Sequence, residues 1–142
     1  MGAHAIVADA ERSEMQGREL RFADGIPGFG HLRRFELLSL GDDTVFQILQ
    51  STEDPDVAMV VVVPWLYFPD YEIELPEDER QRLAIERPED AVIFSPVTLA
   101  AEERAVYVNL AGPFVVNPAT GEGRQVVLTE GDHPLRAPVS LD

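Results

Sequence analysis

The side chains best suited to catalysis or metal binding are scattered along this sequence. The three histidines, His4, His31 and His133, are far apart, and no two have the spacing that places ligands on one face of a helix or strand. No serine occupies the Gly-x-Ser-x-Gly context of a hydrolase nucleophile; the candidates are Ser39, Ser51 and Ser95. The absence of cysteine excludes disulfides, thiolate catalysis and cysteine-bound zinc. The sequence therefore predicts no catalytic, metal or cofactor site.

Two loops contain residue types that bind ligands in other proteins, but neither has a complete motif. Residues 54–56 (Asp-Pro-Asp) lack the glycine and the distal glutamate of a calcium loop. Residues 24–30 are rich in glycine, yet they lack the Lys and Ser/Thr of a P-loop and the strand–helix setting of a dinucleotide site. We interpret residues 24–30 as a turn whose Phe29 packs into the core.

The 142-residue chain has the length of one domain, because typical domains have about 100–150 residues. We predict a single domain over residues 18–142 and a weakly ordered or peripheral N-terminus over residues 1–17, which lack clear periodicity. That N-terminus has neither the basic start nor the long apolar core of a secretory signal, and no apolar run reaches the ~20 residues of a membrane helix. We therefore expect a cytoplasmic protein, monomeric when alone.

The net charge of the chain is strongly negative. Twenty-six acidic residues and eleven basic residues, all of them arginine, give a formal charge of -15 at pH 7. Such a surface repels nucleic acid and anionic membranes, because basic side chains that neutralise phosphates supply most non-specific affinity. Two interpretations stay open: the charge serves solubility, or it attracts a basic partner protein and accelerates its association.

Short apolar runs bounded by Gly, Pro and Asp predict strands. The predicted strands are residues 18–22, 35–40, 46–51, 57–63, 91–99, 105–110, 114–117 and 124–128. Residues 57–63 are continuously apolar, so we expect both of their faces to be buried, whereas Pro96 predicts an edge or a bulge. Residues 76–83 are the helix candidate, with Pro76 at the start and acidic residues in the first turn. The predicted fold is mostly β, an antiparallel β-barrel-like structure or a sandwich, with at most one short helix.

Residues 105–128 contain three of these strands. The last two are predicted to form a hairpin whose loop, residues 118–123, has a glycine at a positive φ angle. Asn109 and Asn117 each close a strand, and we favour a structural role for both because asparagine offers backbone groups a local hydrogen-bond partner. A role in binding is the alternative. Residues 129–142, with two prolines, are predicted to be a tail.

Two neighbouring stretches are candidates for surface recognition. Residues 65–68 hold three aromatic side chains in four residues, which we expect to be core or half-buried; exposed, they would anchor a partner. In residues 70–75, a period of two places Asp70, Glu72 and Glu74 on one face of a strand, with Tyr71, Ile73 and Leu75 on the other. Like charges in a row are costly to bury, so the acidic face must meet water or a cationic partner.

Five segments match a single protein family in order and spacing. They are residues 22–30 (FADGIPGFG, followed by Phe35), 49–54 (LQSTED), 69–72 (PDYE), 108–117 (VNLAGPFVVN) and 123–128 (GRQVVL). Over roughly residues 18–138, the sequence thus resembles the bacterial flagellar assembly factor family FliW. It departs from the family at Gly112, where Ala is usual, near His133, where an aromatic residue is usual, and across residues 3–15.

The resemblance implies a compact β-barrel-like domain without catalytic activity that binds two proteins. One is flagellin; the other is CsrA, a small basic dimer that represses translation by holding messenger RNA. In the family's scheme, free FliW removes CsrA from the flagellin message, and unsecreted flagellin occupies FliW and thereby frees CsrA. This is a partner switch by mass action, because each partner lowers the free FliW available to the other.

We also put forward hypotheses for the residues that bind these partners. We assign the CsrA contact to an acidic set, Asp70, Glu72, Glu74, Glu77 and Asp78. Flagellin has amphipathic terminal helices that need an apolar groove, and we assign that groove to Trp65, Phe68 and Tyr71. The alternative is a barrel that binds a small molecule or catalyses a reaction, for which the sequence offers only scattered histidines and the polar set Asn109, Asn117 and Gln125.

Overall fold

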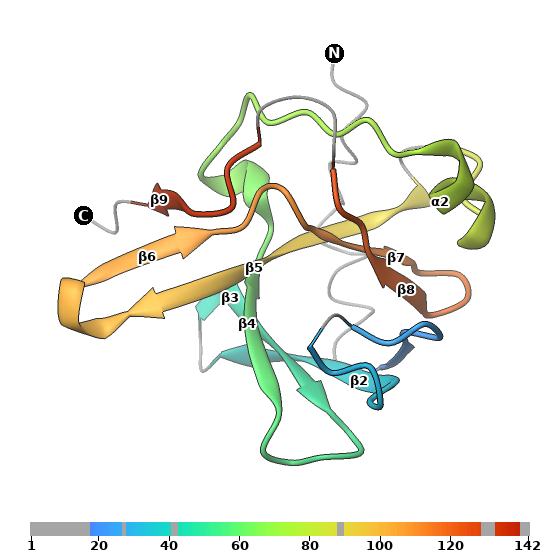
Figure 1. Ribbon diagram of the computed structural model, residues 1–142, viewed down its shortest axis with the longest axis horizontal. Coiled ribbons are helices and arrows are strands. Elements are labelled where there is room, and N and C mark those ends of the chain that lie inside the picture. The colour runs from blue at the N-terminus through green and yellow to red at the C-terminus, as the bar shows by residue number, and fades with distance from the viewer. Residues whose placement is uncertain (1–17, 27, 41–42, 88–89, 129–132, 140–142) are drawn as a thin grey trace.

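A computed structural model describes residues 18–26, 28–40, 43–87, 90–128 and 133–139 of the chain. The predicted weakly ordered segment, residues 1–17, lies outside the described residues. Within them, strands account for most of the regular secondary structure (Figure 1). The strands are β1 (Glu19–Arg21), β2 (Arg34–Leu40), β3 (Asp43–Ser51), β4 (Ala58–Val62), β5 (Val92–Ala100), β6 (Ala105–Val108), β7 (Phe114–Asn117), β8 (Glu122–Gln125) and β9 (Ala137–Val139). The helices are α2 (Glu77–Arg82) and two 3-10 turns, η1 (Pro64–Leu66) and η3 (Ala101–Glu103).

Seven strands close into a barrel, which confirms the predicted barrel-like fold. Their order is β4-β3-β2-β1-β8-β7-β5, and a pairing between β4 and β5 closes the ring. One pairing departs from the antiparallel prediction: β1 runs parallel to β8, with Arg21 opposite Glu122. The barrel is therefore mixed, because its first and last strands in chain order meet side by side in the same direction.

Strand β5 belongs to two sheets at once. Its first residues pair with β7 in the barrel, and its last residues pair with β6, which in turn pairs with β9. Phe94 lies opposite Phe114 and Val97 opposite Val108, so β5 advances by three residues while its partner chain advances by six. Strand β5 itself runs unbroken through Pro96, which pairs with Val61 of β4, so Pro96 lies neither at an edge nor in a bulge of its own strand; the extra residues lie in the partner chain, between β6 and β7.

The barrel interior is filled by apolar side chains. Alternate residues of its strands point inward, and aromatic rings meet at its centre: Phe22 packs edge-on against Phe35 and Phe114, with ring centroids 5.6 and 5.7 Å apart. Gly123 in β8 makes room for them, since a Cβ there would lie 2.9 Å from Val116 Cγ2. The interior set is Leu20, Phe22, Ile26, Leu32, Phe35, Leu37, Leu49, Val61, Val92, Phe94, Phe114 and Val116.

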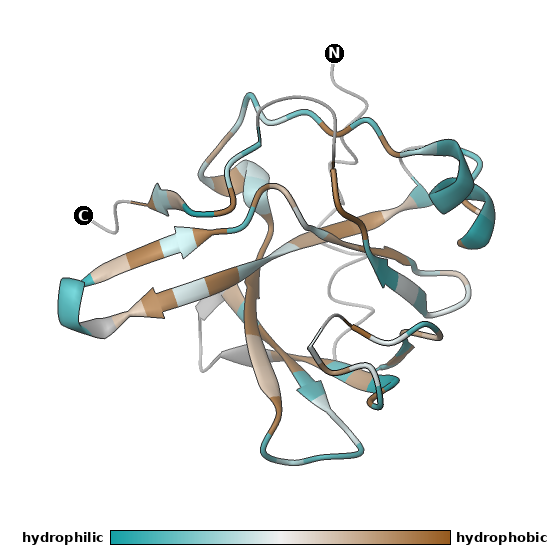
Figure 2. Cartoon of the chain, viewed as in Figure 1, coloured by the Kyte–Doolittle hydropathy of each residue, from teal (hydrophilic) through white to brown (hydrophobic). Residues whose placement is uncertain are grey.

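A second core covers the outer face of the barrel. It lies between β4, β5, β7 and the segment that runs from η1 to α2, and it is Val62, Tyr71, Leu83, Ile85, Ala91, Ile93, Val108, Leu110, Val115, Val126, Leu128 and Ala137. Strand β4 is apolar on both faces because Val61 packs in the barrel interior and Val62 packs in the second core. Figure 2 shows hydrophobic residues along the central strands, whereas α2 is hydrophilic.

Several predicted elements are confirmed, and three are corrected. The 114–128 hairpin forms, and Gly121 in its loop has a φ of 79°. The last predicted strand, residues 124–128, is shifted: β8 is Glu122–Gln125, and beyond it Val126 and Leu128 donate backbone hydrogen bonds to Pro113 and Ala111. The predicted tail contains β9, which the two prolines concealed. Residues 70–75 form no strand of a described sheet.

Candidate functional site

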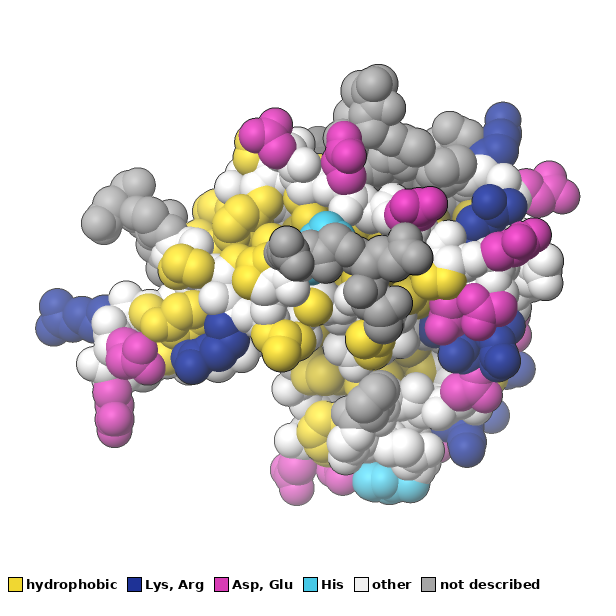
Figure 3. Space-filling model, turned by 45° about the horizontal axis from the view of Figure 1, so that its top comes forward, with side chains coloured by type: hydrophobic (Ala, Val, Ile, Leu, Met, Phe, Trp, Pro, Cys, Tyr) yellow, Lys and Arg dark blue, Asp and Glu magenta, His cyan; other side chains and the backbone are white. Residues whose placement is uncertain are grey.

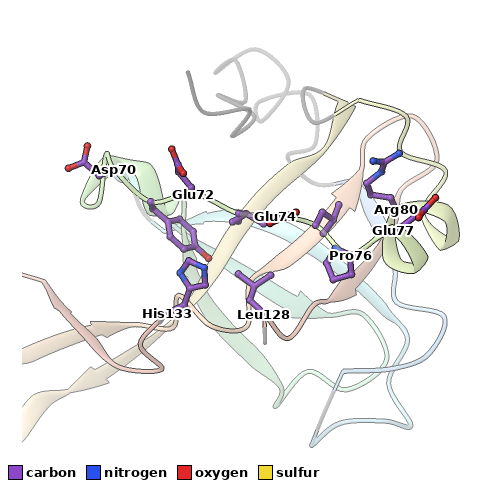
Figure 4. A pocket seen from close by; sticks show the side chains of 11 residues that line it. Asp70, Glu72, Glu74, Pro76, Glu77, Arg80, Leu128 and His133 are labelled. Carbon is purple, nitrogen blue, oxygen red and sulfur yellow. The ribbon is translucent and has the colours of Figure 1, made fainter. Parts of the chain in front are cut away.

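An open groove of about 1020 Å³ lies on the outer side of the second core. Figure 4 shows the segment from Asp70 to Glu77 along one wall, with Leu128 and His133 on the other side. The groove is lined by Asp70, Tyr71, Glu72, Ile73, Glu74, Leu75, Pro76, Glu77, Arg80, Leu128 and His133. Five of the eight residues predicted to bind partners therefore line one groove: Asp70, Tyr71, Glu72, Glu74 and Glu77.

The acidic wall, residues 70–77, begins in a turn at Asp70 and ends where α2 begins at Glu77, and between them residues 71–75 run as an extended segment outside any described sheet rather than as the predicted strand (Figure 4). Its side chains still alternate: Asp70, Glu72 and Glu74 are exposed, and the apolar residues between them turn toward the protein. A proline stands at each end, Pro69 and Pro76, and neither can donate a backbone hydrogen bond. The alternation follows from the extended backbone alone, so it survives without a sheet. On this side of the molecule, acidic side chains border a hydrophobic area (Figure 3).

Tyr71 fixes this segment to the second core. Its ring is buried, and its hydroxyl donates a hydrogen bond of 2.5 Å to the carbonyl oxygen of Leu110. The carbonyl oxygen of Tyr71 accepts a bond of 2.6 Å from Trp65 Nε1, and its N–H donates to the Phe68 carbonyl at 3.0 Å. Burial raises the pKa of the Tyr71 hydroxyl well above its usual value, so the hydroxyl stays a donor at neutral pH.

His133 packs edge-on against the Tyr71 ring, with centroids 5.2 Å apart and an interplanar angle of 86°. This is an arrangement that aromatic pairs favour. The His133 imidazole therefore makes the ring contact that the usual aromatic residue of the family would make at this position. The sequence did not predict that His133, Arg80 and Leu128 line the groove, because nothing in their spacing relates them to residues 70–77.

The aromatic stretch 65–68 is half-buried, as predicted, and its residues are not among those that line the acidic groove. Trp65, Tyr67 and Phe68 pack against the second core, and the Trp65 ring lies 5.5 Å from that of Tyr71. Leu66 between them is 53% exposed. Trp65 and Phe68 therefore pack against the second core next to the acidic wall and do not line the groove.

Helix α2 closes one end of the groove and is tied to the barrel by ion pairs. The Arg124 guanidinium in β8 contacts the carboxylates of both Glu79 and Asp24, and Arg82 lies 3.8 Å from Asp24. Asp78, predicted as a contact residue, is exposed on α2 but does not line the groove. Of the three acidic residues in the first turn of α2, Glu79 thus pairs with Arg124, whereas Glu77 and Asp78 are exposed to solvent.

The polar residues that could have marked a ligand pocket bind the backbone of the protein itself. Asn117 Nδ2 donates to the Leu83 carbonyl at 2.8 Å, and its Oδ1 accepts from the Ala119 N–H at 2.9 Å. Asn109 Oδ1 accepts from two N–H groups of the β6–β7 connection, and Gln125 Nε2 donates to the carbonyl of Gly112 in the same connection. The structural interpretation of both asparagines is confirmed.

The turn between β3 and β4 is stabilised in the same way. Ser51 Oγ accepts from the N–H groups of Glu53 and Asp54, and Glu53 Oε1 accepts from those of Arg33 and Arg34 at 2.7 and 2.9 Å. These two backbone donors hold the pKa of Glu53 below its ordinary value. The segment LQSTED is therefore a structural signature.

The residues first considered for chemistry do not come together. His31 is exposed, His133 lines the groove, and His4 lies outside the described residues. Ser95 is fully buried in β5, and Ser51 caps a turn. Within the described ranges, no group of three or more His, Asp or Glu side chains could hold a metal ion. The same ranges contain no helix long and apolar enough to cross a membrane.

Fold and groove together define a small mixed β-barrel protein with a filled interior and an acidic groove on its outer face. Over residues 7–139, the sequence matches the model of the family described as FliW protein. The chain therefore belongs to the FliW family.

Individual relatives agree with this assignment. The flagellar assembly factor FliW of Clostridium beijerinckii is 36% identical over 118 residues, which are 83% of this chain and 84% of that protein. The factor of the same name from Moorella thermoacetica is 38% identical over 110 residues, 77% of this chain and 70% of that protein. A crystal structure of the flagellar assembly factor FliW has a TM-score of 0.76 and 36% identity, covering 83% of this chain and 82% of its own.

Proposed function

We propose that this protein is a non-catalytic, cytoplasmic flagellar assembly factor that binds flagellin and sequesters the translational repressor CsrA. Free protein would remove CsrA from the flagellin message, and unsecreted flagellin would compete for the protein and return CsrA to the message. The observation that carries the proposal is the family match over residues 7–139, together with relatives named flagellar assembly factor FliW.

The charge distribution supports a basic protein partner. The formal charge of the chain is -15, and three of its exposed carboxylates, Asp70, Glu72 and Glu74, lie together on the groove wall, with Glu77 at the end of the wall. An acidic surface repels RNA, which makes direct competition for the message unfavourable. It attracts a basic RNA-binding protein and accelerates the encounter.

The filled barrel supports a binding module over a ligand-binding or enzymatic barrel. Barrels that hold small molecules do so in their interior or mouth, whereas here Phe22, Phe35 and Phe114 occupy the centre of the interior. For flagellin, we retain the aromatic stretch 65–68 as the candidate surface. Its exposed member, Leu66, would make the direct contact.

The decisive experiment is a titration of a purified CsrA–RNA complex with this protein, with and without flagellin, followed by the fluorescence anisotropy of labelled RNA. We expect RNA release that saturates with added protein and is reversed by flagellin. If RNA stays bound and the protein binds neither CsrA nor flagellin, the proposal is wrong.

The acidic wall is tested by charge reversal. Replacing Asp70, Glu72 and Glu74 together by Lys should slow CsrA association at low salt at least tenfold and flatten its salt dependence. The matched control reverses three exposed acidic residues away from the groove, Asp56, Glu86 and Glu102. Equal on-rates for the two triple variants would refute the assignment of the wall, because they would show that only net charge matters.

A further inference from the structure

Among the described residues, residues 72–75 of the acidic wall present an unpaired backbone edge. Residues 72–75 run as an extended trace outside any helix or strand (Figure 4), and none of their N–H or C=O groups makes a hydrogen bond with another described residue. We propose that this edge receives an added β-strand: an extended segment of a protein partner, with basic and apolar residues in alternation, pairs with residues 72–75 along the groove. The inference rests on the proposed function for the groove as a partner-contact surface, and it adds how the partner is held.

The direction of the free edge follows from Tyr71. In an extended chain, the N–H and C=O of one residue point to one side, and those of the next residue point to the other. Both backbone groups of Tyr71 are bonded on the inner side, to Phe68 and Trp65. Glu72 and Glu74 therefore direct their N–H and C=O groups to the opposite side, which makes them the pairing positions for an added strand.

The side chains around this edge specify the chemistry of the occupant. Glu72 and Glu74 are exposed on one face, roughly 6.6–7 Å apart. On an added strand, residues two apart on the same face lie opposite them, so Lys or Arg at those positions would form cross-strand ion pairs. The intervening residues would face Ile73 and Leu75, which are half-buried and apolar. An alternating basic–apolar segment satisfies both faces.

The size and openness of the groove favour a peptide over a small molecule. Its volume of about 1020 Å³ lies just above the roughly 300–1,000 Å³ found for small-molecule pockets. A partner helix would satisfy its own backbone and leave the edge of residues 72–75 to water. An added strand uses these groups, and main-chain hydrogen bonds then contribute affinity while the alternating side chains contribute specificity.

The test uses a synthetic nine-residue peptide of alternating Arg and Val, and a second peptide of the same composition with its five arginines and four valines in separate blocks. Fluorescence anisotropy should show that the alternating peptide binds at least tenfold more tightly. N-methylation of its alternate residues, which removes the donors on one edge, should weaken binding about threefold to tenfold per bond lost. Equal binding of the alternating and block peptides would overturn the proposal.

A pair of variants at one position separates the backbone from the charge. Glu74→Gln removes the charge alone, whereas Glu74→Pro removes the charge and the N–H that an added strand would use. An extended backbone accepts proline, and tryptophan fluorescence reports whether each variant folds. Glu74→Pro should bind the alternating peptide about threefold to tenfold more weakly than Glu74→Gln. Equal affinities would mean that side chains alone make the contact, which would overturn strand addition.

Amide hydrogen exchange in the unmodified protein supplies a readout that does not depend on any variant. Bound peptide should slow exchange at Glu72 and Glu74 relative to the free protein, and unchanged exchange there would overturn strand addition. The proposed function fails separately: if peptide protects these amides but the protein releases no RNA from CsrA, the surface stands and its assigned partner is wrong. If RNA is released and the amides stay unprotected, the proposed function stands and strand addition is wrong.

Discussion

Asn117 is the side chain whose replacement tests the structure most sharply. It is buried at the end of β7, and its Nδ2 donates at 2.8 Å to the carbonyl of Leu83, the residue that caps α2. Leu83 is 2% exposed, so water cannot replace the donor. A buried carbonyl left without a partner costs about 1–3 kcal/mol. With the lost bond to the Ala119 N–H, Asn117→Ala should lower the free energy of unfolding by about 2–4 kcal/mol.

The assay is urea denaturation followed by the fluorescence of Trp65, the sole tryptophan, which packs against Tyr71 in the second core. The urea midpoint should fall without a change in the dependence on urea concentration, because the surface exposed on unfolding is unchanged. Thr120→Ala in the same hairpin is the matched control. It removes the exposed hydrogen bond that the Glu122 N–H donates to Thr120 Oγ1 and the long contact, 3.5 Å, from that hydroxyl to the Asn117 carbonyl, and it should change stability by less than about 0.5 kcal/mol.

Asn117→Asp extends the test to pH. The new carboxyl group would face the carbonyl oxygens of Leu83 and Ala84, which Asn117 Nδ2 now faces at 2.8 and 3.4 Å. Both oxygens and the burial of the site disfavour its ionised form and outweigh the one bond that the Ala119 N–H would donate to the other carboxyl oxygen, so its pKa in the folded state rises above the unfolded value. The variant should therefore regain stability relative to the wild type as pH falls from about 7 toward about 4. A pH-independent difference, or Asn117→Ala within about 0.5 kcal/mol of wild type, would refute the reasoning.

Three further predictions concern packing, charge and the groove. Gly123→Ala should destabilise by about 1–3 kcal/mol, since its Cβ would lie 2.9 Å from Val116 Cγ2, whereas Gly30→Ala meets nothing within 4 Å and should be neutral in the same thermal melt. Glu53→Gln should lower the urea midpoint at pH 7. Because the pKa of Glu53 is lower in the folded protein than in the unfolded chain, the stability that its carboxylate contributes is lost as the pH falls through the folded pKa. Urea midpoints of wild type and variant that still differ in acid would contradict this. Tyr71→Phe should cost about 1–2 kcal/mol by calorimetry, because it leaves a buried carbonyl unpaired while keeping the ring; an unchanged transition would show that the hydroxyl bond contributes nothing.

The local elements were predictable where a short stretch contains all of its own determinants. Strand β7 and helix α2 lie within one residue of their predicted bounds, because periodicity and Gly/Pro punctuation are local signals. Strand β9 was missed for the opposite reason. Its three residues include Pro138 and acquire strand geometry only by pairing with β6.

The candidate site was predictable in part. The alternation of residues 70–75 revealed the exposed carboxylates, since an extended backbone imposes it in any context. Nothing local indicated that Leu128 and His133 form the opposite side of the groove, or that Tyr71 bonds to Leu110, a residue 39 positions away. These contacts depend on the long-range packing of the second core.

By itself, the sequence determined the mostly β class, the acidic character, the turn glycines and the family signature. Each of these depends on residue type, short-range spacing or total charge. Only the tertiary structure decided that the barrel closes through a parallel contact, that its interior is filled, and that residues 72–75 keep a free backbone edge among the described residues. The reason is physical: closure, packing and hydrogen-bond pairing are relations between distant segments, and no local pattern of side chains specifies which backbone groups remain unpaired.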